Sequence, residues 1–290
     1  MRIALINSGI GLLAPAAALH RLRPDADLVL ASDPEGMPWG PRTPDDIANR
    51  ALLCARAAAR YVPDVLLMAC NTGSVHALEA LRAEFEPAIP VIGTVPAIKP
   101  AAAAHQVIAI WATVATTHSA YQRRLIAEFG GSAEVTPVAC PGLADAVDAG
   151  DEPAIAAAIA DAAARTPDNC EAVVLGCTEY ELAADRISRA IPGAITMGSA
   201  AAVAAQALRR AVPGSAGNSG NGAASAADRG PLVPSAPAIA RALGTVRVLL
   251  SGRPAGLPAA AARYPEGRLL APLVLDPDRA PAVPDRALAD

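Results

Sequence analysis

Aromatic residues are scarce in this sequence: phenylalanine, tryptophan and tyrosine make up 3% of its 290 residues. A strong charge of either sign is also missing, because the formal net charge is −4 and no basic cluster stands out along the chain. Proteins that bind nucleic acid or an anionic membrane usually present a basic surface to it. We therefore expect neither nucleic acid nor a membrane among the partners of this chain.

Long apolar runs and paired cysteine motifs are missing too. No uninterrupted apolar run approaches the roughly 20 residues that cross a bilayer, and the first residues enter a predicted strand without the apolar region of a signal peptide. The five cysteines show no C-x-x-C spacing of the kind that binds zinc. An odd number of thiols is typical of a reducing compartment. We expect a cytoplasmic protein with no metal and no other cofactor.

Alanine and aliphatic residues are abundant, and hydrophobic residues make up 53% of the chain. Alanine-rich segments with a helical period alternate with short runs of valine, isoleucine and leucine. This alternation predicts an α/β fold with mainly parallel sheets. The length is sufficient for two domains of ordinary size.

One predicted strand end organises the chain. Val65–Met68 are an apolar run that leads to Cys70, Asn71 and Thr72, and a helical pattern begins at about Ser74. In open α/β sheets such a turn lies at the carboxyl edge of the strands, where ligands bind. The free amides at the start of the following helix favour an anion such as a carboxylate. Cys70 is therefore expected beside a carboxylate-binding site.

The same arrangement returns at Ala172–Leu175, which lead to Cys177 and Thr178. A single cysteine at a strand end is usually a small core residue, and we interpret Cys54 and Cys140 in that way. Two thiols in matching contexts instead indicate chemistry. Two facing thiols suit a reaction in which one removes a proton from a carbon and the other delivers a proton to the opposite face. The repeat predicts two similar α/β halves, each presenting one thiol.

Polar side chains follow two other predicted strands. Asn7 and Ser8 come after the first strand, where they either face the same crevice as Cys70 or belong to an ordinary strand–helix connection. Thr113 and Thr116 follow a later strand, where they either bind a carboxylate or cap the next helix.

A long loop and a glycine-rich segment interrupt the regular pattern. Four prolines among residues 33–44 exclude regular structure there, and Trp39 in this loop is either a surface plug or a pocket wall. Residues 213–237 have the composition of a flexible linker. A strand is predicted again at Val246–Gly252 and a short helix at Pro258–Tyr264, but no periodicity predicts structure from residue 265 onward.

Several of these motifs together resemble the glutamate racemase branch of the cofactor-independent aspartate/glutamate racemases. The resemblance covers roughly residues 1–212 and 244–264. The matching stretches are Asn7–Gly11, Trp39–Thr43, Ala69–Thr72, Leu175–Thr178 and Val246–Gly252.

The resemblance implies two pseudo-symmetric, doubly wound α/β domains with the active site between them. It places the first domain at 1–94, 197–212 and 244–264, the second at 95–196, a flexible insertion at 213–243 and a tail at 265–290. It also implies cofactor-independent racemisation of glutamate, which in this family supplies D-glutamate for peptidoglycan. A homodimer is a further expectation.

Family roles carry over residue by residue. Cys70 and Cys177 correspond to the two acid/base thiols; in the family the first-domain thiol deprotonates the D-isomer and the second-domain thiol the L-isomer. The residues expected to bind the substrate are Ser8, Trp39, Gly40, Asn71, Thr72, Thr113, Thr116 and Thr178.

Three positions depart from the family pattern. Asn7 replaces an assisting aspartate, Asp148 replaces a glutamate, and Glu179 replaces a histidine and is a choice associated with the aspartate racemase branch. We expect these three residues to assist the thiols, with the Cys70 half lacking one carboxylate. Glutamate is the first expected substrate, aspartate or both amino acids the alternative. A divergent member that binds an amino acid without racemising it is the other alternative.

Overall fold

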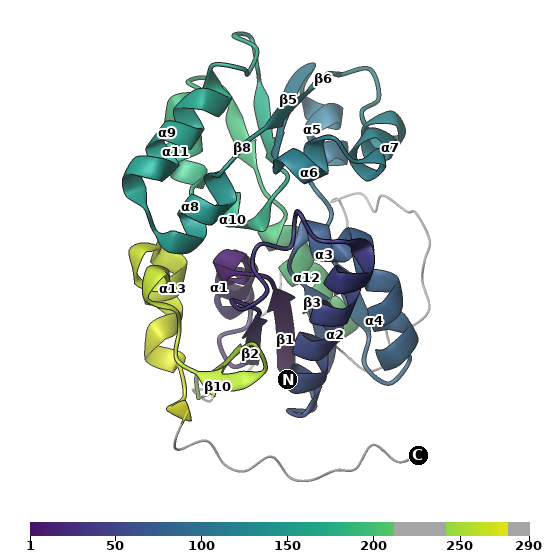
Figure 1. The fold of residues 1–290 in the computed structure, drawn as a ribbon, viewed down its shortest axis with the longest axis vertical. Coiled ribbons are helices and arrows are strands. Elements are labelled where there is room, and N and C mark those ends of the chain that lie inside the picture. Colours follow the sequence, from purple (N-terminus) through teal and green to yellow (C-terminus); the bar gives the residue numbers. More distant parts are fainter. Residues whose placement is uncertain (212–241, 278–290) are drawn as a thin grey trace, which may run out of the picture.

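The computed structural model describes residues 1–211 and 242–277, which form two α/β domains with a sheet each (Figure 1). The first sheet has the strand order β10-β9-β2-β1-β3-β4, and all its neighbours are parallel except β10 and β9. Its strands are β1 (Arg2–Asn7), β2 (Asp27–Ser32), β3 (Val65–Met68), β4 (Val91–Gly93), β9 (Val246–Leu250) and β10 (Arg253–Ala255). The predicted fold class is confirmed.

The second sheet has the strand order β6-β5-β7-β8 and is parallel throughout. Its strands are β5 (Val107–Ala112), β6 (Glu134–Ala139), β7 (Ala172–Leu175) and β8 (Ile195–Met197). Strands β3 and β7 are central, and each consists of four buried apolar residues. Such uninterrupted apolar runs are typical of parallel strands that are covered on both faces.

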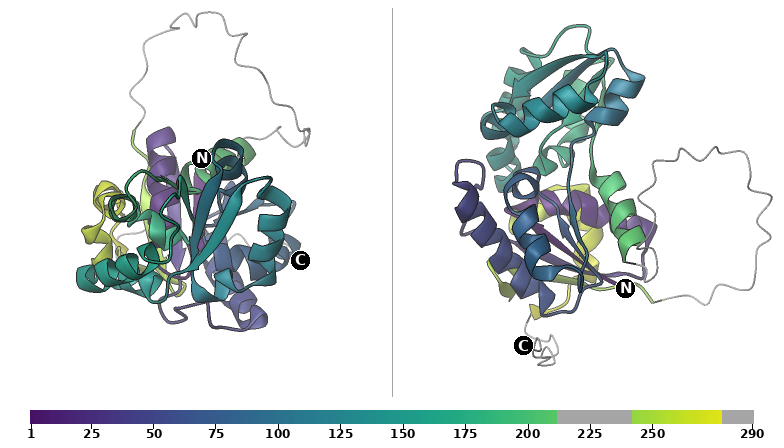
Figure 2. Two further views of the ribbon diagram at one scale, coloured as in Figure 1. Left: turned by 90° about the horizontal axis from the view of Figure 1, so that it is seen from above. Right: turned by 90° about the vertical axis from the view of Figure 1, so that its right-hand side faces the viewer.

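Helices cover both sheets. Those packed on the first sheet are η1 (Ile10–Leu12), α1 (Leu13–Leu22), α2 (Pro44–Ala59), α3 (Asn71–His76), α4 (Leu78–Phe85) and α12 (Ala200–Arg210). Those of the second domain are α5 (Ile98–Ala104), α6 (Val114–Thr117), α7 (Ala120–Phe129), α8 (Leu143–Ala149), α9 (Glu152–Ala163), α10 (Thr178–Glu181) and α11 (Ala184–Ala190). Helix α12 brings the chain back from the second domain and packs beside α1 (Figure 2).

The two domains share part of their core. One cluster of buried apolar residues runs from Leu13 on α1 to Val147 on α8 and Tyr180 on α10. Tyr264 belongs to the same cluster, and its hydroxyl donates a 2.7 Å hydrogen bond to the carbonyl of Val147. This packing holds the domains together on the α1 side.

The C-terminal part of the described chain is more regular than the sequence indicates. The structure has a 3₁₀ helix η2 (Ala259–Arg263) where a short helix is predicted, and then α13 (Pro265–Leu270) and η3 (Ala271–Leu273) in what is expected to be a tail without predictable structure. Helix α13 is only six residues long, too short to show a period, and it forms because it packs on α1. A proline at its first position suits a helix start.

Most of the predicted insertion, 213–243, lies outside the described residues. The domain boundaries inferred from the resemblance stay predictions. Within 1–211 and 242–277, no helix combines the length and the apolar character needed to cross a bilayer.

Candidate active site

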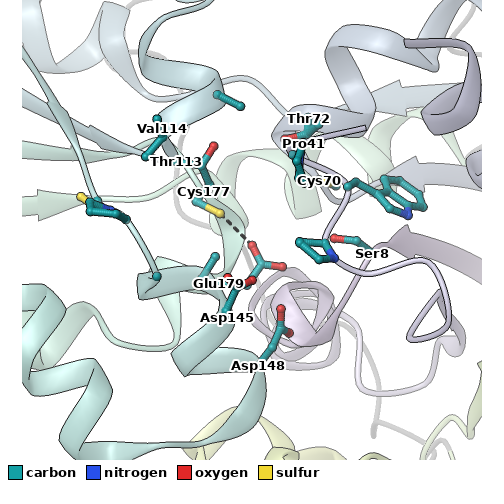
Figure 3. Close-up of a pocket in the computed structure, with 18 residues that line it drawn as sticks. Ser8, Pro41, Cys70, Thr72, Thr113, Val114, Asp145, Asp148, Cys177 and Glu179 are labelled. Carbon is teal, nitrogen blue, oxygen red and sulfur yellow. Dashed lines mark hydrogen bonds between the residues drawn. The ribbon is translucent and has the colours of Figure 1, made fainter. Parts of the chain in front are cut away.

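The carboxyl ends of both sheets meet at one cavity of about 400 Å³ (Figure 3). Ser8 and Cys70 reach it from the ends of β1 and β3 in the first domain. Thr113, Cys140 and Cys177 reach it from the ends of β5, β6 and β7 in the second. The cavity therefore lies between the domains, where the rule for open α/β sheets places a ligand.

Cys70 caps the first turn of α3. Its Sγ accepts a hydrogen bond of 3.4 Å from the backbone N–H of Gly73. Burial, followed by the negative charge of Glu179, raises the pKa of the Cys70 thiol to about 12. Hydrogen bonds from Gly73 and Ser8 favour the thiolate and offset part of that rise.

Cys177 occupies the corresponding position before α10. Its thiol donates a 2.8 Å hydrogen bond to Oε2 of Glu179, drawn as a dashed line in Figure 3. Burial is the main cause that raises the pKa of Cys177, and the charge of Glu179 and this hydrogen bond add to it. A carboxylate at this distance can also accept the thiol's proton.

Asn7 is fully buried beneath the two thiol-bearing turns. Its Nδ2 donates to the carbonyl of Ala69, at 2.7 Å, and to Oγ1 of Thr178, at 3.1 Å. Asn7 and Thr178 do not line the cavity. Of the two alternatives for Asn7, the structure does not place its side chain in the lining of the crevice, because its amide donates to a buried carbonyl and to a hydroxyl of the other domain. Its expected role in assisting the thiols stays a prediction.

Asp148 and Glu179 lie on the second domain but pack against the first. Oδ1 of Asp148 accepts a 2.8 Å hydrogen bond from the backbone N–H of Ile10, and the side chain lies against Gly9. Burial first, and then the charge of Glu179, raise the pKa of Asp148 well above its usual range. Glu179 lies against Gly11, where an added Cβ would stand 2.5 Å from Oε1.

Several uncharged polar groups surround the thiols. Thr72 and Thr113 line the cavity, and Thr116 lies just behind, where its hydroxyl accepts a 3.1 Å hydrogen bond from that of Thr113. Thr113 also caps α6, so the helix-capping alternative holds for it. Asn71 is buried, and its side-chain oxygen and nitrogen find no partner among the described residues. A buried amide without partners is costly unless a ligand supplies them.

The loop of residues 33–43 forms one wall. Trp39 is a pocket wall and not a surface plug, because it lines the cavity and its side chain is buried. Gly40 faces the second domain, since a Cβ placed on it would lie 3.9 Å from that of Ala115.

The cavity thus gathers nine of the thirteen residues expected from the sequence: Ser8, Trp39, Gly40, Cys70, Thr72, Thr113, Asp148, Cys177 and Glu179. Sequence reasoning missed Asp145, Pro38, Pro41 and Val114, and Cys140, interpreted as structural, also lines the cavity. The lining has three carboxyl groups and, among the described residues, no lysine, arginine or histidine. The part of the chain that is described holds no cluster of metal-binding side chains.

Known proteins resemble this chain over most of its length. Residues 12–207 match the family described as Asp/Glu/Hydantoin racemase. The glutamate racemase of Pseudomonas entomophila (strain L48) is 32% identical over 213 residues, which are 72% of this chain and 80% of that protein. The glutamate racemase of Roseiflexus sp. (strain RS-1) is 34% identical over 200 residues, with coverages of 67% and 73%.

Among solved structures, Escherichia coli glutamate racemase in complex with L-glutamate and the activator UDP-MurNAc-Ala has a TM-score of 0.67 to this chain. Its sequence identity is 28%, and the match covers 72% of this chain and 82% of that one.

Proposed function

The chain belongs to the Asp/Glu/Hydantoin racemase family, and from that premise we propose that it interconverts L- and D-glutamate with Cys70 and Cys177 as the two acid/base groups. The observation that carries the proposal is the placement of both thiols, from corresponding strand ends of the two domains, in one cavity. The reaction supplies D-glutamate for peptidoglycan in the cytoplasm and uses no cofactor.

Proton transfer begins with the formation of a thiolate, because an α-proton is too weakly acidic for a neutral thiol to remove. For the L-isomer, Cys177 passes its proton to Oε2 of Glu179, at 2.8 Å, and becomes the thiolate. The thiolate removes the α-proton, and the electron pair of that C–H bond stays on Cα. Cys70 then gives its thiol proton to the opposite face.

After this step Cys177 is a thiol and Cys70 a thiolate. Those are the forms that the reverse reaction from the D-isomer requires, so the same pair serves both directions. The burial that raises the pKa of both thiols also raises their basicity, which helps them to remove a carbon-bound proton once they are ionised.

Uncharged donors bind the substrate carboxylates in place of a cationic side chain. The hydroxyls of Ser8 and Thr72 line the cavity together with Cys70. Asn71 follows Cys70 in the chain, but its buried, unpartnered amide is not among the residues that line the cavity. Thr113 and Gly40 lie across the cavity and suit the second carboxylate. Thr178 and Thr116 support these groups from behind. The carboxylate of Glu179 offers a partner for the substrate's ammonium group, and the carboxyl oxygens of Asp148 offer further acceptors for it.

Circular dichroism of purified enzyme with L-glutamate, and in parallel L-aspartate, tests the proposal without added cofactor. We expect the signal of L-glutamate to decay to zero. Cys70→Ser and Cys177→Ser should each abolish the decay, whereas Cys54→Ser, which changes a buried thiol away from the cavity, should leave it nearly intact.

Three outcomes contradict the proposal in different ways. If the signal of L-aspartate decays faster than that of L-glutamate, the substrate is aspartate, the alternative suggested by Glu179. Binding of glutamate without racemisation assigns the chain to the non-racemising alternative. Full activity in either Cys variant excludes the two-thiol mechanism. The homodimer stays a prediction, for which sedimentation of the same enzyme is the test.

A further inference from the structure

A hydrogen-bonded chain links Asn7 in the first domain to Glu179 in the second. Nδ2 of Asn7 donates to Oγ1 of Thr178, at 3.1 Å, and that hydroxyl donates to Oε2 of Glu179, at 3.3 Å. Oδ1 of Asn7 accepts from Ser8 Oγ, at 3.2 Å, and from the N–H of Gly9. Each donor in the chain therefore points toward the Glu179 carboxylate.

We propose that Glu179 is one carboxylate that serves both thiols, and that Asn7 is the positioning residue that holds it in place through Thr178. The amide at position 7 and the carboxylate at position 179 then form one unit across the domain boundary. This inference rests on the proposed function for its role in catalysis, but its geometry is a property of the free protein.

The carbonyl of Ala69 favours an amide at position 7 of this chain. It lies 2.7 Å from Nδ2 of Asn7 and accepts a hydrogen bond from it. An ionised aspartate has only acceptors. An aspartate at position 7 would place one carboxylate oxygen against the carbonyl of Ala69. Its other oxygen would be separated from the Glu179 carboxylate only by the hydroxyl of Thr178, which can donate to one of the two. An aspartate at position 7 and a glutamate at position 179 are therefore incompatible in their ionised forms.

Glu179 lies between the two thiol-bearing turns. Oε2 accepts the proton of Cys177, and Oε1 lies against Gly11 of the first domain without a hydrogen-bond partner among the described residues. Cys70, Cys177 and Glu179 line the same cavity, so the charge of Glu179 faces both sulfurs. In agreement with this placement, it raises the pKa of Cys70 as well as that of Cys177. In Figure 3 its carboxyl group points toward the first-domain side of the cavity.

Other titratable groups face Glu179 from the surrounding elements. Asp148 and Asp145 lie on α8, and Tyr180 follows on α10. Asp145 adds negative charge to the same region, whereas burial raises the pKa of Asp148 and favours its neutral form. Tyr180 is fully buried, and its hydroxyl donates a hydrogen bond to the carbonyl of Cys140. Among the charged groups around the two thiols, Glu179 has the largest effect on their pKa values. A variant that removes its charge leaves Asp145 and Asp148 in place.

The test measures the protonation of each thiol directly. Iodoacetamide alkylation of the full-length enzyme from pH 6 to 10, with each cysteine quantified by mass spectrometry, gives a rate profile for Cys70 and for Cys177 without any substrate. At a pH below the pKa, each rate is proportional to the thiolate fraction of that cysteine. Glu179→Gln should raise both rates about tenfold or more at a given pH, the usual effect of removing a close like charge. Asn7→Asp should slow the alkylation of Cys177, which lies in the other domain, and lower kcat/KM in both directions.

Asn49→Asp is the matched control, because it places the same charge at an exposed site on α2 and should change neither thiol. Thr178→Val breaks the chain without adding charge and should also alter the Cys177 profile, while Thr178→Ser keeps the hydroxyl and should restore it. These two Thr178 variants test whether the hydrogen-bonded chain positions Glu179, even if Asn7→Asp does not fold.

The proposal is overturned if Glu179→Gln changes only Cys177, if the Cys177 profile is the same in Thr178→Val and wild type, or if Asn7→Asp raises kcat/KM. Failure of the wild-type enzyme to racemise glutamate would instead contradict the proposed function. It would leave the alkylation result as an independent answer about Asn7 and Glu179.

Discussion

Nε1 of Trp39 donates a 3.1 Å hydrogen bond to Oδ2 of Asp33, and this contact fixes the wall of the cavity. The same carboxylate, almost completely buried, accepts from Arg50 on α2, at 3.2 Å, and from Ser251 after β9, at 3.2 Å. One side chain thus joins the proline-rich loop to a helix and to the last parallel strand of the sheet. These bonds hold the loop from the side away from the cavity, and they fix Trp39 and Gly40 in the cavity lining.

Replacement of Asp33 should damage both stability and substrate binding. Asp33→Ala leaves the buried indole N–H of Trp39 without its acceptor and removes one of the two carboxylate partners that Arg50 has among the described residues. We expect the free energy of unfolding in urea to fall by about 1–3 kcal/mol. We also expect KM to rise more than kcat falls, because the loop binds and does not react. Asp46→Ala is the control, since Asp46 pairs with the same Arg50 at the surface, where an ion pair contributes little. Equal losses for both variants would contradict this role of Asp33.

The two thiol-bearing turns can be predicted because their signals are local. Val65–Met68 and Ala172–Leu175 are apolar runs of strand length, and the edge at which parallel strands present their ends follows from a general rule. The position of Cys140 carries the same signal, since it ends β6 beside β5. Cys140 is interpreted as structural because no threonine follows it. It nevertheless lines the cavity, so a following threonine is not needed for a strand-end cysteine to reach the site.

Other features of the site depend on contacts that no local pattern shows. Asp33 meets partners 6, 17 and 218 positions away in the sequence. The direction of the Asn7 amide depends on a carbonyl 62 positions and a hydroxyl 171 positions away. The strand at Arg2–Asn7 is predictable from its composition. The partners of the Asn7 side chain are not, because they come together only when the two domains pack.

Asp148 should lower the stability of the protein at neutral pH. Its pKa is raised in the folded state, mainly by burial, so the folded protein favours the neutral carboxyl. The stabilising contribution is therefore full below the unfolded pKa of about 4 and is lost as the pH rises through the folded pKa. Asp148→Asn keeps an acceptor for the N–H of Ile10 and removes the charge.

We expect Asp148→Asn to be more stable than wild type at pH 7, because wild type loses stability as the pH rises from the unfolded pKa of about 4 toward the folded pKa. The variant should lose this advantage near pH 4. Its racemase activity should fall. Urea unfolding at several pH values measures the difference. Asp168→Asn, at an exposed loop position, should stay within about 0.5 kcal/mol of wild type throughout. If Asp148→Asn is less stable than wild type at pH 7, the ionised Asp148 carboxylate is stabilised by its surroundings in the folded protein, which contradicts the prediction.

Gly11 gives the sharpest test of how closely the two domains must approach. A Cβ at this position would lie 2.5 Å from Oε1 of Glu179 and 2.5 Å from Oγ1 of Thr178, so Gly11→Ala must displace the carboxylate that accepts the Cys177 proton. We expect kcat/KM to fall about 100-fold, the lower end of the range for losing the proposed general base. Overpacking should also cost about 1–3 kcal/mol of stability.

Two comparisons separate displacement of Glu179 from simple destabilisation. Gly256→Ala adds the same methyl group where no atom lies within 4 Å, and it should leave kcat/KM and stability nearly unchanged. In Gly11→Ala, the alkylation profile of Cys177 should shift along the pH axis at temperatures well below unfolding, because the carboxylate no longer sits 2.8 Å from the sulfur. Lower stability with an unchanged Cys177 profile would mean that Glu179 keeps its contact and that the backbone around η1 absorbs the added methyl group.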